Sequence, residues 1–385
     1  METSIKQQVR IKLMNFKILK SDNNSKARIT EFILPHGKVS TPIFMPVGTN
    51  GSVKAVKHKT LYDSGVDLIL SNTYHLFLRP GSNVIKQAGG LHNFISWQQN
   101  ILTDSGGFQI FSLAPFRKIT NDGIKFRSHI DGSYHTLTPE DVVELQRVFK
   151  SDILMPLDVC TAHNTEYKKS ISAMKITHNW AARSMEYWKR YREEWGGELF
   201  GIIQGNFYKD LRKESAEYIC SLDFPGIAIG GLSVGEPFDM FKEFLEHTSS
   251  LIDDNKPHYL MGIGTPEYII EAVENGIDMF DCVYPTRIAR NGTLFTRNGK
   301  ITIKKENFAN DFGPIEEKCN CFACSNYSRA FIRHLFKTNE ILGPMLATEH
   351  NLAFIRDLIS EIKSNIESNT FIDFKKRFLD NYGNN

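Results

Sequence analysis

Short apolar runs recur along most of the chain, and each ends in glycine or polar residues. Eight of them stand out: "TPIFMPVGT" (41–49), "DLILSNTYHL" (67–76), "ILTDSGGF" (101–108), "ILMPLDVC" (153–160), "LFGIIQG" (199–205), "GIAIGGL" (226–232), "HYLMGIGT" (258–265) and "DMFDCVYPTR" (278–287). Strands that are covered on both faces have continuous apolar runs, whereas half-exposed strands alternate apolar and polar residues. The pattern therefore predicts the strands of a buried parallel sheet.

Helical patterns lie between several of these runs. In "TPEDVVELQRVFK" (138–150), Thr138 suits the N-cap and Pro139 the first helical position, and apolar residues follow at helical spacing. "TPEYIIEAVENG" (265–276) repeats this arrangement, and Gly276 can end that helix. Alternating strands and helices, with eight strands over roughly 250 residues, predict an α/β fold of the (β/α)8 TIM-barrel type. An open doubly wound sheet is the alternative, because periodicity does not show whether a sheet closes.

In such a barrel the carboxyl ends of the strands form one mouth, where enzymes of this fold place their chemistry. Three carboxylates and one amide converge there, and the residues at the run ends are Asp104 with Ser105, Gly106 and Gly107, then Asp158, Gln204, Gly230, Gly231, Met261, Gly262 and Asp281. Because a buried unpaired carboxylate is costly, acids in this position indicate a function. Asp278 lies near the start of its run and points away from the mouth, so we expect it to be structural.

The pattern changes after residue 300. Three cysteines, Cys319, Cys321 and Cys324, come first, and residues 328–368 then have helix-like apolar spacing that is interrupted at Gly343 and Pro344. We therefore expect two domains. Residues 1–300 would form a (β/α)8 catalytic core with N-terminal strands, and residues 301–385 a zinc-binding helical subdomain packed on the barrel.

The cysteine cluster indicates a metal site. In a chain without a secretion signal, cysteines this close favour metal ligation over disulfides, which a reducing cytosol disfavours. Three thiolates leave one position open on a tetrahedral Zn²⁺, and His334 and His350 both lie downstream as candidates for the fourth ligand. Nothing in the cluster indicates an open catalytic position, so we expect a structural zinc, one per subunit. Iron–sulfur ligation is the alternative.

Composition and charge add two expectations. The chain of 385 residues is 41% hydrophobic and 23% charged, as in an ordinary soluble globular protein. The N-terminus "METSIKQQVRIKLMNFKILK" has no signal-peptide core, and no run of about 18 apolar residues occurs, which predicts a cytoplasmic protein without a membrane partner. The net charge is only +2, yet residues 285–337 hold ten Lys and Arg against four Asp and Glu. This excess is either a solvated surface or a polyanion-binding face.

Five motifs together resemble those of the bacterial tRNA-guanine transglycosylases, the queuine tRNA-ribosyltransferase family. They are "LTDSGGFQIFSL" (102–113), "GGLSVGE" (230–236), "YLMGIGTPE" (259–267), "MFDCVYPTR" (279–287) and the C-x-C-x2-C cluster followed by "EHN" (349–351). The resemblance spans nearly the whole chain. It implies a homodimeric enzyme of queuosine biosynthesis that replaces guanine at wobble position 34 of tRNAs with a GUN anticodon (Asp, Asn, His and Tyr). The incoming base is a 7-deazaguanine, preQ1 in most bacteria.

The resemblance also implies roles for the matching residues. Asp281 is the expected nucleophile at the ribose C1′ and Asp104 the general acid and base. The expected base-binding residues are Asp104, Ser105, Gly106, Gly107, Phe108, Asp158, Gln204, Gly231, Leu232 and Met261. The expected RNA contacts are Gly262, Ile263, Gly264, Thr265, Pro266, Glu267, Tyr268, Thr286, Arg287, Ile288, Ala289 and Arg290. The implied metal ligands are Cys319, Cys321, Cys324 and His350, which favours His350 over His334.

Reaction chemistry supports these roles independently. Replacing one base by another with retained configuration at C1′ requires two inversions, and hence a carboxylate nucleophile and a covalent intermediate. A second carboxylate must protonate the departing guanine. Asp158 and Gln204 offer acceptors and donors that match the edge of a purine-like ring. Phe108 and Met261 are candidates to sandwich the ring, although the residues alone suit an ordinary core better.

One residue departs from the family pattern. Many bacterial members have an acid after the base-binding aspartate, where this chain has Val159, so preQ1 and queuine both stay open as the incoming base. Cys160 and Val234 resemble the bacterial pattern, and Glu236 is available to favour an aminomethyl cation. We therefore expect preQ1.

Three other interpretations are weighed against this one. A non-catalytic tRNA-binding subunit is disfavoured by the three aspartates at the mouth. A barrel glycosidase is disfavoured by the cysteine cluster, the basic stretch and the lack of tryptophan at the strand ends. A phosphate cradle at "GGLSVGE" is disfavoured because no Lys-Ser/Thr follows the glycines.

Overall fold

The computed structural model describes residues 14–113 and 116–383. Its central feature is a sheet of eight parallel strands: β4 (Ile43–Pro46), β5 (Leu68–Asn72), β6 (Asn100–Asp104), β10 (Ile153–Leu154), β11 (Glu198–Ile203), β12 (Gly226–Ile229), β13 (His258–Leu260) and β14 (Met279–Cys282). Each of the eight predicted runs corresponds to one of these strands, because each run is apolar on both faces and can be covered on both.

The sheet closes into a barrel. Its strand order is β4-β14-β13-β12-β11-β10-β6-β5, which leaves β4 and β5 at the two ends. A parallel bridge between Val47 and Leu70 joins these ends, and the Gly48 N–H donates to Leu70 O at 2.7 Å. Closure confirms the (β/α)8 prediction and excludes the open doubly wound sheet.

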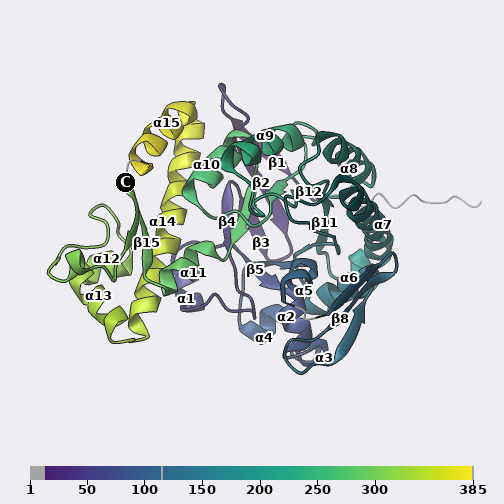
Figure 1. The fold of residues 1–385 in the computed structure, drawn as a ribbon, viewed down its shortest axis with the longest axis horizontal. Coiled ribbons are helices and arrows are strands. Elements are labelled where there is room, and N and C mark those ends of the chain that lie inside the picture. Colours follow the sequence, from purple (N-terminus) through teal and green to yellow (C-terminus); the bar gives the residue numbers. More distant parts are fainter. Residues whose placement is uncertain (1–13, 114–115, 384–385) are drawn as a thin grey trace, which may run out of the picture.

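Helices surround the barrel (Figure 1). They are α1 (His58–Asp63), α2 (Thr73–Leu78), α3 (Ser82–Gln87), α4 (Leu91–Ile95), α5 (Gly107–Leu113), α6 (Pro139–Phe149), α7 (Tyr167–Tyr191), α8 (Lys209–Ser221), α9 (Phe238–Ser249), α10 (Pro266–Glu274) and α11 (Tyr284–Arg290), with a short 3₁₀ helix at Arg192–Glu194. The two predicted helices are α6 and α10. Helix α6 begins with a capping box, in which the Asp141 N–H donates to Thr138 Oγ1 at 3.1 Å and the Thr138 N–H to Asp141 Oδ2 at 2.9 Å.

Two small antiparallel sheets are added to the barrel. The first contains β1 (Lys17–Ser21), β2 (Arg28–Leu34) and β3 (Gly37–Ser40). Its residues Phe32, Leu34 and Val39 share one buried cluster with barrel-strand residues such as Met45 and Leu68, so this sheet covers the amino end of the barrel. The second contains β7 (Arg117–Thr120), β8 (Gly123–Arg127) and β9 (Tyr134–Leu137), between α5 and α6.

Asp278 lies at that covered amino end and is structural, as predicted. Its two carboxylate oxygens accept hydrogen bonds from Arg28 Nε at 3.1 Å and Arg28 Nη2 at 2.6 Å. The Thr30 and Thr41 hydroxyls and the His258 N–H also donate to it. The carboxylate is therefore fully buried but paired, and it ties the first small sheet to the barrel.

The chain after the barrel forms β15 (Thr293–Thr296), β16 (Gly299–Thr302), a short 3₁₀ helix at Glu306–Phe308, α12 (Phe322–Asn326), α13 (Arg329–Lys337), α14 (Leu342–Glu367) and α15 (Phe371–Tyr382). The helical pattern is interrupted between α13 and α14, before Gly343 and Pro344, so the predicted position of the break was wrong by a few residues. Pro344 falls in the first turn of α14, where backbone N–H groups have no partner within the helix and proline is tolerated.

Helix α14 connects the cysteine region to the barrel (Figure 1). Leu346 and Ala347 near its start belong to a cluster that also contains Cys321 and Ile332. Residues farther along, such as Phe354, belong to the large cluster between the barrel strands and their helices. The division of the chain at residue 300 stays a prediction. Within the described residues, the structure has no helix whose length and apolar character would let it cross a lipid bilayer.

Candidate active site and metal centre

Asp281 lies on β14 at the mouth of the barrel, and only one of its two carboxylate oxygens accepts hydrogen bonds from the described residues. Its Oδ1 accepts from Tyr259 Oη at 2.6 Å and from the Gly262 N–H at 2.9 Å. No donor among the described residues bonds to Oδ2. Burial raises the pKa of the carboxyl, and the hydrogen bonds from Tyr259 and Gly262 offset part of that rise. The side chain is thus fixed in orientation with one oxygen free to react.

Asp104 is the last residue of β6, and three donors hold its carboxyl. The N–H groups of Thr73 and Gly106 donate to Oδ1 at 3.0 and 3.1 Å, and the Asn72 amide donates to Oδ2. Burial, with a smaller contribution from the negative charge of Asp281, raises the pKa of Asp104 to about 7, although these hydrogen bonds lower it. Near neutral pH, Asp104 can therefore carry or release a proton beside Asp281.

Asp158 and Gln204 form a polar pair on the same mouth. Gln204 Nε2 donates to Asp158 Oδ2 at 2.7 Å, and the Ser105 hydroxyl lies 3.5 Å from Oδ1. Burial raises the pKa of Asp158 to about 6, which leaves it mainly ionised at neutral pH. The backbone of Gly231, at φ +70°, packs so closely on Gln204 that an added Cβ would lie 2.5 Å from Oε1. The positive φ and this close approach both favour glycine there.

Phe108 and Met261 differ in their surroundings. Phe108 is in the first turn of α5 and is 53% exposed, so it does not belong to the core that the residues alone suggested. Met261 follows β13, is half-buried and packs against the cluster inside the barrel. Phe108 thus has an exposed ring face, whereas much of Met261 is already covered.

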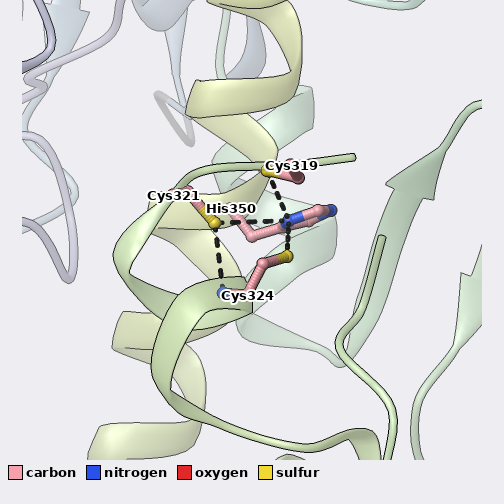
Figure 2. A group of neighbouring side chains, drawn as sticks. All are labelled: Cys319, Cys321, Cys324 and His350. Atoms are coloured by element: carbon pink, nitrogen blue, oxygen red, sulfur yellow. Dashed lines mark hydrogen bonds between the residues drawn. The ribbon is translucent and has the colours of Figure 1, made fainter. Parts of the chain in front are cut away.

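Cys319, Cys321, Cys324 and His350 converge in the C-terminal region (Figure 2). The three cysteines come from the loop before α12 and from α12 itself, and His350 comes from α14. Their sulfur atoms lie 3.9, 3.6 and 3.3 Å from His350 Nδ1. His334 is exposed on α13 and lies outside this group, so the structure selects His350 among the two candidates that the residues left open.

This geometry fits a tetrahedral zinc ion. With Zn–S bonds of about 2.3 Å and Zn–N bonds of about 2.0 Å, tetrahedral ligands lie about 3.5 to 3.8 Å apart. His350 Nε2 lies 2.8 Å from Phe295 O, and this hydrogen bond leaves Nδ1 unprotonated toward the three sulfurs. All four ligands belong to the protein, so the site offers no open position.

A second cluster of potential metal ligands, formed by two histidines and one aspartate, lies at the amino end of the barrel, but its geometry is unsuited to a metal. Asp152 Oδ1 lies 2.7 Å from His36 Nδ1, and its Oδ2 lies 3.0 Å from His92 Nε2. The two imidazole rings stack with centroids 3.6 Å apart and planes only 13° apart. A metal must lie near the plane of each ring that binds it, and nearly parallel planes at this spacing share no such point. The group is better described as two imidazoles that donate to one carboxylate.

Comparisons with known proteins decide the family. A family model described as "Queuine tRNA-ribosyltransferase" matches residues 22–384. Proteins named queuine tRNA-ribosyltransferase from Borrelia recurrentis, Treponema denticola and Caldanaerobacter subterraneus are 54%, 53% and 50% identical to this chain. The alignments cover 95%, 96% and 97% of this chain, and 98%, 97% and 98% of those proteins. The chain belongs to the queuine tRNA-ribosyltransferase family. The predicted resemblance is confirmed, and the chain is an enzyme.

The two segments that the family resemblance assigns to RNA lie side by side. A Cβ at Gly264 would lie 2.4 Å from Cys282 Cβ and 3.1 Å from Cδ of Pro285, which belongs to α11. Gly262 and Arg287 are exposed, whereas a second set of side chains is buried: Ile263, Pro266, Thr286 and Ala289. The exposed members are accessible from solvent, and the buried ones belong to the packed interior.

Val159, where this chain departs from the family pattern, turns away from the pocket, and Glu236 contacts the 230–236 loop. Val159 is buried in the cluster that contains Trp180 and Leu157, so the missing acid does not remove a charge from the Asp158 and Gln204 surface. Glu236 accepts the backbone N–H groups of Ser233 and Val234, the latter at 2.8 Å. Its carboxylate therefore first stabilises the 230–236 loop.

Sequence reasoning missed the residues that hold the two catalytic candidates. Asn72, the last residue of β5, and Thr73, which follows it, hold Asp104, and Tyr259 on β13 holds Asp281. Asn72 was available to the argument from strand ends, because it is the last residue of β5. Tyr259 gave no such signal, because a tyrosine within an apolar run is as typical of an ordinary core strand as of a site.

Proposed function

We propose that the protein is a tRNA-guanine transglycosylase that exchanges guanine at wobble position 34 of GUN-anticodon tRNAs for a 7-deazaguanine in queuosine biosynthesis. The observation that carries this proposal is the pair of carboxyls at the mouth. Oδ1 of Asp281 accepts two hydrogen bonds, which leaves Oδ2 without a donor among the described residues. The nearby Asp104 has a pKa of about 7, to which the charge of Asp281 contributes.

In the first half of the reaction, Asp281 Oδ2 attacks the ribose C1′ and forms a covalent aspartyl-ribosyl bond. The C1′–N9 bond breaks, its electron pair stays on guanine, and Asp104 supplies the proton that makes guanine neutral. In the second half, Asp104 accepts a proton from the incoming base, whose nitrogen attacks C1′ and releases Asp281. Two inversions retain the configuration at C1′.

Asp158, Gln204 and Gly231 would read the base. The Asp158 carboxylate accepts from the N1–H and exocyclic amine of guanine, and Gln204 and the Gly231 N–H donate to its O6. Without a base, Gln204 donates to Asp158, so the pocket exchanges an internal hydrogen bond for bonds to the ligand. Ser105, Gly106, Gly107 and Leu232 form the walls, and Phe108 covers one face of the ring with Met261 on the other.

The incoming base is proposed to be preQ1, with queuine as the second candidate. Val159 lies in the core and does not alter the pocket surface. The buried Glu236 carboxylate lies in the 230–236 loop and offers acceptor oxygens that would favour a cationic aminomethyl group. Cys160 and Val234 match the bacterial pattern.

The remaining parts are proposed to support tRNA binding. Segments 262–268 and 286–290 would contact the anticodon loop, chiefly through Gly262, Arg287 and Arg290. Cys319, Cys321, Cys324 and His350 would hold one structural zinc ion per subunit, which ties the loop before α12 to α14. We further propose a cytoplasmic homodimer.

The test is guanine exchange into tRNA. Wild-type protein is incubated with unmodified tRNA-Tyr and labelled guanine, and preQ1 and queuine then compete for incorporation. We expect incorporation at position 34, with preQ1 the better competitor. Asp281→Asn should form no covalent enzyme–RNA adduct on a denaturing gel while it still binds tRNA.

Two outcomes would contradict the proposal in different ways. An adduct that persists in Asp281→Asn would reject the nucleophile assignment. Failure of the wild type to incorporate any of the three bases, with tRNA binding intact, would favour a non-catalytic tRNA-binding subunit.

A further inference from the structure

Arg212 on α8 is a fully buried cation behind the proposed base pocket. Its Nε donates to Asn206 O at 2.8 Å, and its Nη1 donates to Gly230 O at 2.8 Å. Both partners are backbone carbonyls that follow barrel strands, Asn206 after β11 and Gly230 after β12. Arg212 therefore connects two neighbouring strand ends at the mouth.

The charge of Arg212 is not matched by a direct ion pair. No carboxylate among the described residues forms a salt bridge with it, and its Nη2 has no hydrogen-bond partner there. Burial lowers the pKa of the guanidinium to about 10, so it stays protonated at neutral pH. An unpaired buried cation is costly to folding. Such a residue is more readily explained by a function than by stability.

The bond to Gly230 sets the direction of one peptide group. In a trans peptide the carbonyl and the following N–H point in opposite directions. Because Gly230 O points at Arg212, the Gly231 N–H points away from it. Among the described residues no acceptor takes this N–H. Gly230 and Gly231 both pack on the Gln204 amide, where an added Cβ would lie 2.6 or 2.5 Å from its atoms.

We propose that Arg212 is a positioning residue for base exchange: it holds the Gly230–Gly231 peptide so that the Gly231 N–H meets O6 of the base, and its buried positive charge stabilises electron density on that oxygen. This inference rests on the proposed function, because it needs guanine in the pocket formed by Asp158 and Gln204.

This role is explained by the negative charge that develops on guanine in the first half-reaction. When the C1′–N9 bond breaks, its electron pair stays on guanine and spreads through the ring to O6, while the Asp281 oxygen bonds to C1′. A donor at O6, backed by a buried cation, stabilises this charge until Asp104 delivers its proton. In the second half the same donor stabilises the incoming base as it loses its proton to Asp104.

The experiment compares Arg212→Gln and Arg212→Lys with wild type in guanine exchange. For Arg212→Gln we expect the KM for guanine to rise about tenfold or more and kcat to fall, with the Kd for tRNA unchanged. Arg212→Lys keeps a cation and should recover part of the loss. The control is Arg28→Lys, another buried arginine at the opposite end of the barrel, which should lower thermal stability but leave the KM for guanine unchanged.

Three results would overturn the inference. One is a folded Arg212→Gln with the guanine KM and kcat of wild type. Another is an equal rise of KM in Arg28→Lys. If neither Arg212 variant folds, wild type with ¹⁵N-labelled arginine side chains is titrated with guanine, and the absence of any perturbed, slowly exchanging guanidinium signal would reject the role. A wild type that exchanges no guanine contradicts the proposed function instead.

Discussion

The same substitution at Asp278 and at Asp281 should affect different properties, stability in the first case and catalysis in the second. Asp278 precedes β14 at the amino end of the barrel, and Asp281 lies three residues later at the mouth. Replacing either by asparagine keeps the shape of the side chain, removes its charge and replaces one acceptor oxygen by an amide donor. We expect Asp278→Asn to destabilise the protein, and Asp281→Asn to abolish the covalent adduct without lowering stability.

The magnitude for Asp278 follows from its partners. Its carboxylate accepts two bonds from Arg28, at 3.1 and 2.6 Å, and both side chains are buried. Removing one member of a buried pair leaves the other charge uncompensated and costs about 3–5 kcal/mol. With an unfolding entropy of about 2.1 cal/mol/K per residue, a chain of this length would lose about 4–6 °C in its thermal midpoint.

At Asp281, in contrast, loss of the charge should not lower the stability of the folded protein. Burial raises its pKa in the folded protein, so the ionised carboxylate lowers stability as the pH rises through that folded pKa. Asparagine is neutral at every pH and can still accept from Tyr259 and Gly262. At pH 8 we therefore expect the stability of Asp281→Asn to match or exceed that of wild type.

The assay is thermal unfolding of both variants and wild type, followed by circular dichroism at pH 8. Adduct formation with tRNA is measured on denaturing gels well below the midpoints, where a folded Asp278→Asn should still form the adduct. Equal destabilisation by the two substitutions would refute the argument, because it would mean that Asp281 is as firmly paired as Asp278. Loss of the adduct in a fully folded Asp278→Asn would refute the separation of the two roles.

Two further predictions concern the acid and the metal. The pKa of Asp104 is raised to about 7, mainly by burial, so the protonated form that delivers a proton to guanine is lost at higher pH. Adduct formation by the wild type should therefore slow about tenfold per pH unit above pH 7. Adduct formation by Asp104→Asn should be slow at every pH, without this alkaline decline. A rate that is constant from pH 7 to 9 in the wild type would contradict this role. Because His350 lies among the three cysteines and His334 is exposed, His350→Ala should lose bound zinc and have a lower thermal midpoint, while His334→Ala should retain about one zinc ion per chain by metal analysis. Zinc loss in His334→Ala alone would show that the ligand set is wrong.

Much of the site could be predicted from the sequence because its residues follow apolar runs. Asp104, Asp158, Gln204 and Asp281 were found by asking what stands at or just beyond the end of each run, and the structure brings Asp158 and Gln204 into direct contact. Asp104 and Asp281 are close enough for the charge of one to raise the pKa of the other. This worked because parallel strands of one barrel direct their carboxyl ends to the same face.

The residues that support the site could not be predicted in this way. Tyr259 holds Asp281, Asn72 holds Asp104 and Arg212 holds Gly230, and each of these contacts joins different elements. A tyrosine within a strand, an asparagine at its end and an arginine on a helix each have ordinary explanations. Their role depends on which elements become neighbours, and apolar spacing along one segment does not contain that information.

The sequence by itself determined the local elements: strands where apolar runs can be covered on both faces, helices where capping residues precede an apolar stripe, and a metal site where three thiols cluster. Only the tertiary structure decided that the sheet closes through Val47 and Leu70, and that His350 rather than His334 faces the cysteines. It also showed that Val159 points into the core. The physical reason is that hydrophobic periodicity and capping act within a few residues of the chain, whereas closure, ligand choice and side-chain direction depend on packing between segments that are distant in sequence.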